Sequence, residues 1–207
     1  FNNADVLLIT FGTAWVYENV ESGKVVSNCH KIPAKQFVRR KLSVNEIVAL
    51  WTALIQKLIR IRPEIKLIFT VSPIRHWKDG AHENNISKST LLLSIAELQQ
   101  IFSETIYFPA YEIQLDELRD YRFYAADMLH PSEVAVDYIW ERFSETFFND
   151  DTILLKNKLE RFSTQLSHRP IHPDSDDYQK FIENRDHTAA KLIQEYPFLA
   201  ERIHKKS

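Results

Sequence analysis

Asp127 and His130 stand three residues apart in the polar segment AADMLHPS, residues 125–132, directly ahead of a helical pattern. A histidine that acts as a general base needs its other ring nitrogen held by an acceptor, and a carboxylate in the same turn can hold it. We therefore predict that the two residues form an acid-base pair. The alternative is that Asp127 only caps the turn and that His130 is an ordinary surface residue.

Other polar residues follow the predicted strands, where the ligand sites of open α/β sheets collect. Gly12 ends the first strand and indicates a tight turn or a close backbone approach to a ligand, with a plain turn as the alternative. Arg75 and His76 follow the second strand. We expect all three to line the site, as residues that bind substrate or an oxyanion.

The segment Asn28-Cys29-His30-Lys31 carries four polar side chains in a row. We expect Asn28 to donate a hydrogen bond to an oxyanion and His30 to contact substrate, and an exposed loop is the alternative. Cys29 is not expected to act as a nucleophile with His30, because adjacent residues of an extended segment point apart.

Ser72 and the remaining histidines are weaker candidates. Ser72 precedes Pro73 and lacks a glycine-flanked elbow, so we interpret it as structural. His76 and His82 lie near Asp79, but their spacing matches no zinc signature, and a solvated polar loop is the favoured interpretation. We expect neither a metal ion nor a cofactor.

Two arginines precede the Asp-His pair in the segment LDELRDYRFYAADMLHPS. Arg119 and Arg122 either form buried ion pairs that shape the turn or hold an anionic or sugar-like substrate. We favour the structural role.

Apolar periodicity predicts strands and helices in alternation. Continuous apolar runs predict strands at 6–9, 67–71 and 106–108, the first as a central strand covered on both faces. Helical spacing predicts helices over 44–61, 91–102 and 136–147, the last with Pro131 in its first turn. Such alternation is typical of an α/β fold with a parallel sheet between helices.

Beyond residue 150 the strand signals cease, and helices are predicted over 155–166 and 178–196. We therefore expect an α/β domain over 1–150 and a helical extension over 151–207. The extension is a separate lobe, a cover for the sheet or a dimerisation element, so a homo-oligomer stays open. Three strands are few for a parallel sheet, and we expect at least one partner strand to lie upstream of Phe1.

Composition narrows the function classes. Of 207 residues, 44% are hydrophobic and 26% charged, which is typical of a globular protein. The net charge of -2 with scattered Lys and Arg argues against a nucleic-acid partner. No apolar run is long enough to span a membrane. One cysteine excludes an internal disulfide, and with no signal segment the compartment stays open, the cytoplasm being favoured.

The chain resembles the GSCFA domain family, a bacterial group related to SGNH hydrolases. The resemblance rests on ITFGTAWVY, NCHKIP, FTVSPIRHWKDG, NNISKSTL, YFPAYEIQLDELRDYRFYAADMLHPS and YIWERF, and spans about residues 5–143. It implies a three-layer, flavodoxin-like α/β/α sandwich in which the family's Asp-x-x-His block falls on Asp127 and His130.

The resemblance also implies a nucleophilic serine in a Gly-Ser-Cys-Phe-Ala segment, and this sequence contains no such segment. We expect that serine upstream of the chain, so the chain by itself is expected to be inactive. SGNH enzymes usually carry Gly-x-Asn-Asp after the first strand, where this sequence has Gly12-Thr13-Ala14-Trp15. Asn28 is then the candidate substitute for the usual asparagine donor.

The function we favour is an SGNH-like serine esterase or acyltransferase. Its substrate would be an acyl ester of a small molecule or of a carbohydrate. A non-catalytic module that binds a glycan or an acyl group is the alternative. A weaker third is a metal-dependent hydrolase that uses His30, His76 and His82.

Overall fold

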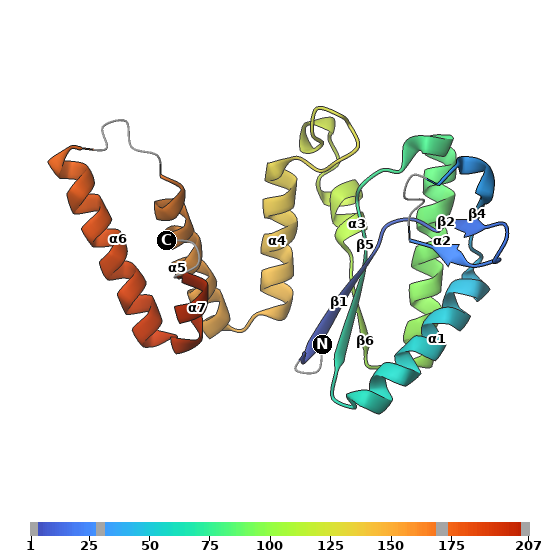
Figure 1. Ribbon diagram of the computed structural model, residues 1–207, viewed down its shortest axis with the longest axis horizontal. Coiled ribbons are helices and arrows are strands. Elements are labelled where there is room, and N and C mark those ends of the chain that lie inside the picture. The colour runs from blue at the N-terminus through green and yellow to red at the C-terminus, as the bar shows by residue number, and fades with distance from the viewer. Residues whose placement is uncertain (1–3, 28–31, 169–173, 204–207) are drawn as a thin grey trace. The chain divides into compact units, whose positions relative to one another are not determined.

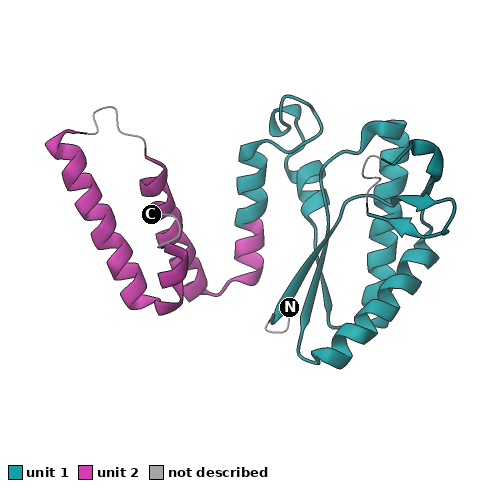
Figure 2. Ribbon diagram, viewed as in Figure 1, with its two compact units in different colours: residues 1–141 teal, residues 142–207 magenta. Residues whose placement is uncertain are grey.

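The structure is a computed structural model that describes residues 4–27, 32–168 and 174–203. The chain divides into two compact units, residues 1–141 and 142–207 (Figure 2). The predicted boundary at residue 150 stays a prediction. Within the described ranges, no helix has both the length and the apolar character needed to cross a bilayer.

A parallel three-stranded sheet forms the centre of the first unit, as the sequence predicts. Its strands lie in the order β1-β5-β6 (Figure 1) and comprise β1 (Val6–Phe11), β5 (Lys66–Val71) and β6 (Thr105–Phe108). Val6 pairs with Lys66 and Leu67 with Thr105, so all three carboxyl ends lie at one edge of the sheet. The α/β class and the parallel sheet are thereby confirmed.

The central strand is β5, and the prediction that the first strand is covered on both faces is wrong. Leu67 and Ile68 point to opposite faces of β5, and both side chains are buried. In β1 the side chains of Val6 and Leu8 are 52% and 48% exposed. Among the described residues β1 pairs with β5 alone, so it is an edge strand with one open face.

Two long helices connect the strands. α1 (Val44–Ile61) begins at a capping box in which the Ser43 hydroxyl accepts the Glu46 N–H and the Glu46 carboxylate accepts the Ser43 N–H. It ends ahead of Pro63, whose ring disfavours helix in the preceding residue. α2 (Gly80–Ile101) begins at a glycine with a φ of +87°, a conformation that other residues rarely adopt.

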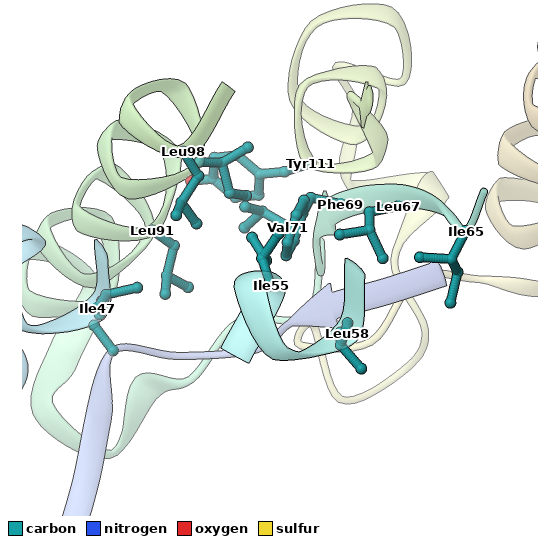
Figure 3. Packing of buried hydrophobic residues seen from close by; sticks show 12 residues of the cluster. Ile47, Ile55, Leu58, Ile65, Leu67, Phe69, Val71, Leu91, Leu98 and Tyr111 are labelled. Atoms are coloured by element: carbon teal, nitrogen blue, oxygen red, sulfur yellow. The ribbon is translucent and has the colours of Figure 1, made fainter. Parts of the chain in front are cut away.

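The core of this unit lies between the sheet and these two helices (Figure 3). Phe69 and Val71 of β5 are fully buried against Ile55 of α1 and Leu98 of α2, among others. Such burial contributes roughly 1.5–3 kcal/mol for each large side chain. This packing holds β5 in place, and with it the loop that follows the strand.

A second, antiparallel sheet follows β1 in the chain and was not predicted. It has the order β3-β2-β4 and comprises β2 (Trp15–Asn19), β3 (Val25–Val26) and β4 (Phe37–Lys41) (Figure 1). The guanidinium of Arg39 lies 4.3 Å from the centre of the Trp15 ring, a cation-aromatic contact in place of an apolar pair. A 3-10 turn at Ala34–Gln36 leads into β4.

The chain after β6 is irregular up to α4 (Glu133–Phe147). It passes through α3 (Ala110–Glu112), a π-helical turn at Ile113–Glu117 and a 3-10 turn at Tyr121–Phe123. Pro131 does not occupy the first turn of α4, contrary to the sequence expectation. It forms an isolated antiparallel bridge with Tyr124 instead, and the Ser132 hydroxyl accepts the Ala135 N–H at the helix start.

The second unit is helical, as predicted for the tail. Its helices are the end of α4, α5 (Asp150–Ser167), α6 (Asp176–Glu195) and α7 (Ala200–Ile203), with a 3-10 turn at Pro197–Leu199. Phe162, Leu192, Leu199 and Ile203 form a buried cluster. The unit therefore has an apolar core of its own.

Candidate functional site

The turn ahead of α4 brings the predicted acid-base pair together. His130 Nδ1 lies 2.6 Å from Asp127 Oδ2, while Asp127 Oδ1 accepts the N–H groups of Leu129 and His130 at 2.9 and 3.0 Å. The backbone N–H groups of His130 and Leu129, followed by the His130 imidazole, lower the pKa of Asp127 to about 2. Asp127 is therefore a carboxylate at neutral pH, and its hydrogen bond fixes the orientation of the ring.

Hydrogen bonds across the turn hold the segment between these two residues in a tight bend. The Ala125 N–H donates to the His130 carbonyl at 2.8 Å, and the Met128 N–H donates to the Ala125 carbonyl at 2.9 Å. Met128 has a φ of +59°, in the left-handed region. A non-glycine residue there costs about 1–2 kcal/mol, and such strain is concentrated at functional sites.

Arg75 connects this turn to the loop that follows β5. Its N–H donates to the Leu129 carbonyl at 3.1 Å, and its Nη1 donates to the Met128 carbonyl at 3.3 Å. Its guanidinium also lies 3.9 Å from the centre of the Tyr124 ring. The predicted site residue Arg75 and the Asp127-His130 turn therefore lie side by side at the carboxyl edge of the sheet.

His76 and Gly12 lie close together at the same edge. A Cβ added to Gly12 would meet His76 Nε2 at 3.5 Å, an ordinary contact, and the φ of Gly12 is outside the left-handed region. The pKa of His76 is lowered mainly by burial, and the positive charges of Lys88, His130 and Arg39 lower it further.

Lys88 of α2 joins two of the strand ends, and the sequence interpretation missed it. The side chain is 1% exposed, and its ammonium donates to the carbonyls of Gly12 and Ser72 at 2.7 and 2.6 Å. Burial lowers the pKa of Lys88 to about 8. A buried lysine bound to two carbonyls fixes the separation of the loops that follow β1 and β5.

Two further residues of α2 hold the same loops. Asn84 Oδ1 accepts the His76 N–H at 2.9 Å, and Ser87 Oγ accepts the Ala14 N–H at 2.8 Å. Asn84, Ser87 and Lys88 recur at the spacing of one helix face and continue the apolar stripe that includes Leu91. This polar start to an otherwise apolar stripe is the sequence signal that would have identified them.

The other candidates are placed as follows. Ser72 is buried, and its Oγ accepts the Ile74 N–H at 3.2 Å, in keeping with a structural role. Asn28 and His30 fall outside the described residues, as does Cys29. His82 is exposed, and the described chain holds no cluster of three or more His, Cys, Asp or Glu suited to a metal ion.

Arg119 and Arg122 are both exposed, so the buried ion pairs that we favoured for them are not formed by the described residues. Arg119 instead lines a pocket beside the Asp127-His130 turn, together with Arg75.

The arrangement can perform acid-base chemistry. The side chain of His130 is 56% exposed, so a reacting group can approach it, while Nδ1 is engaged by Asp127. A neutral imidazole held in this way carries its proton on Nδ1 and offers the lone pair of Nε2 as a base.

Comparison with known proteins gives one match. A family model described as the GSCFA family matches residues 1–143, which include every candidate residue above. No curated protein and no solved structure matches.

Proposed function

The chain belongs to the GSCFA family, and from that premise we propose an SGNH-like serine esterase or acyltransferase that acts on an acyl ester through Asp127 and His130. The observation that carries the proposal is the 2.6 Å contact between His130 Nδ1 and Asp127 Oδ2. It is supported by the two backbone N–H groups that keep Asp127 ionised.

In the proposed reaction a serine hydroxyl attacks the acyl carbonyl while His130 Nε2 takes the hydroxyl proton. The carbonyl oxygen becomes an oxyanion, and the C–O bond to the leaving alcohol then breaks as His130 returns the proton to that alcohol. Water or a second alcohol repeats the sequence on the acyl-enzyme. Asp127 holds the ring and stabilises the imidazolium in each half-reaction.

The nucleophilic serine belongs to the Gly-Ser-Cys-Phe-Ala segment that the family resemblance implies, which the present sequence does not contain. The Gly12 N–H and Asn28 remain the proposed oxyanion donors. The position of Gly12 supports this role, because Gly12 lies beside His76 at the carboxyl edge of the sheet. The proposed substrate is an acyl ester of a carbohydrate.

The test is hydrolysis of a small aryl ester by a protein in which a Gly-Ser-Cys-Phe-Ala segment is joined to this chain. We expect His130→Ala to lower kcat by about 10²–10⁴-fold, the usual contribution of a general base. His82→Ala, which removes an exposed histidine of α2, should leave kcat unchanged. An unchanged rate in His130→Ala contradicts the mechanism.

The second candidate, a glycan- or acyl-binding module without turnover, makes a different prediction. It predicts saturable binding of an acylated sugar and no hydrolysis by that same joined protein. It also predicts that His130→Ala and the wild type bind alike.

A further inference from the structure

A small pocket lies against the Asp127-His130 turn. Its volume is about 170 Å³. Its lining residues come from the loop after β5, the π-helical turn and the segment before the Asp127-His130 turn, and include Arg75, Gln114, Arg119, Asp120, Tyr121 and Tyr124. Typical pockets for drug-sized ligands measure roughly 300–1,000 Å³, so this one suits a single small group and not a whole oligosaccharide.

Two residues that line the pocket, Arg75 and Tyr124, also contact the Asp127-His130 turn. Arg75 donates to the carbonyls of Met128 and Leu129, the two residues between Asp127 and His130. Tyr124 forms its backbone bridge with Pro131, the neighbour of His130. A group bound in this pocket therefore lies beside the turn that carries His130.

The charges around the pocket favour an anion. Two guanidinium groups, those of Arg75 and Arg119, line it, against one carboxylate, that of Asp120, whose Oδ1 accepts the Arg122 N–H at 2.9 Å. Of the five N–H donors of the Arg75 guanidinium, one donates to the Met128 carbonyl. The side chain of Arg119 is exposed, so its planar fork is accessible to a carboxylate or a phosphate.

The remaining lining residues favour a sugar as the carrier of that anion. Tyr121 is 63% exposed and presents an aromatic ring, against which the C–H groups of a sugar ring can pack. Gln114 is 1% exposed, and its Nε2 donates to the Phe123 carbonyl at 3.2 Å, whereas its buried Oε1 has no partner among the described residues. Unpaired buried acceptors are uncommon and are often found at functional sites.

We propose that this pocket binds the anionic sugar unit of an acidic acylated carbohydrate and so places a neighbouring acyl ester at His130. The statement about the ester rests on the proposed function, whereas binding of the sugar does not. The anion is a carboxylate, as in a uronic acid, or a phosphate, and both share the chemistry that Arg75 and Arg119 recognise.

The experiment is a calorimetric titration of the protein with glucuronate, glucose 6-phosphate and glucose at low salt. We expect at least one of the two anionic sugars to bind at least about fivefold tighter than glucose, as for a charge-assisted contact at a half-exposed site. The tighter of the two identifies the anion. Arg119→Gln should abolish the preference, and Arg122→Gln, which changes an exposed arginine outside the pocket, should retain it.

Repeating the titration with His130→Ala separates the two proposals. Preferential binding that persists in this variant supports the pocket whether or not the joined protein hydrolyses esters. Equal binding of glucose and both anions, or a preference that survives Arg119→Gln, overturns the pocket proposal and leaves the esterase proposal standing.

Discussion

Met128 is the residue at which backbone strain and proposed chemistry coincide. Among the described residues it is the one non-glycine with a positive φ, at +59°, and it lies between Asp127 and His130. Its side chain is 46% exposed, so little packing offsets the strain. The hydrogen bonds from Arg75 and within the turn over-determine this conformation, which is how a strained residue persists.

Substitution of Met128 should therefore change stability according to backbone preference. We expect Met128→Gly to leave the free energy of unfolding unchanged or to raise it by up to about 1 kcal/mol, because glycine adopts this φ freely. Met128→Val should lower it by about 1–2 kcal/mol, since a β-branched residue tolerates the left-handed region poorly. Urea unfolding followed by tryptophan fluorescence measures both, and equal stability of the two variants would contradict the assigned conformation.

Asp127 should make stability depend on acid pH. Its pKa is about 2 in the folded chain against an ordinary 3.8, so the folded state favours the carboxylate. The contribution is fully present above pH 3.8 and is lost as the pH falls through about 2. We expect the stability difference between the wild type and Asp127→Asn to shrink as the pH falls below about 4.

Urea unfolding at a series of pH values measures that difference. Glu46, whose pKa is also lowered to about 2, titrates in both proteins and so cancels from the comparison. A difference that stays constant down to pH 2 would show that Asp127 is not held by the donors described.

At the scale of elements, α2 is the helix that positions the site. One stripe of α2 buries Leu91, Ile95 and Leu98 against the sheet, and the same stripe closer to the N-terminus carries the polar residues that bind the strand ends. The helix thus fixes the positions of the loops that follow β1 and β5. These contacts also position the loop that carries Arg75 and His76.

Replacement of Lys88 tests this role. Lys88→Met removes the donors of two carbonyls, each at a cost of about 1–3 kcal/mol, partly offset because no ammonium is then buried. We expect a net loss of about 1–3 kcal/mol in urea unfolding. Lys57→Met, at an exposed position of α1, is the control and should change stability by less than about 0.5 kcal/mol. Equal effects of the two substitutions would remove the special role of Lys88.

The elements differ in how far the sequence predicts them. The bounds of α1 follow from its apolar spacing and from Pro63, because both signals are local. The antiparallel sheet does not follow, because β4 sets Arg39 against the aromatic rings of β2 instead of presenting an apolar face. The Asp-x-x-His turn is local and was predicted, whereas the contact of Lys88 with Gly12 joins residues far apart in sequence.

At the scale of the whole molecule, all described candidate residues lie in the first unit. The family match over residues 1–143 ends close to the boundary of that unit at Glu141. The sequence predicted the helices of the second unit from their periodicity. It did not predict a role for them, because an apolar stripe is equally suited to a core, a cover or an interface.

The core of the second unit should be separable from the first by mutation. Phe162 is 4% exposed in a cluster with Leu192, Leu199 and Ile203. Phe→Ala in a core costs about 3–5 kcal/mol, and a unit of this length has a stability of roughly 3–10 kcal/mol. We therefore expect Phe162→Ala to remove a large part of the stability of this unit and to lower the melting temperature of α5 and α6 steeply.

Trp15, Trp51 and Trp77 lie in the first unit, whereas Trp140 is on α4, which crosses the boundary at Glu141, so fluorescence is followed in a Trp140→Phe background. Phe162→Ala should move part of the thermal loss of the far-ultraviolet helical signal to lower temperature while leaving the thermal transition of tryptophan fluorescence in place. Leu154→Ala, at a 58% exposed position of α5, should change neither signal. If the fluorescence transition falls together with the helical signal, the two cores unfold as one, and the division into separate units has no energetic meaning.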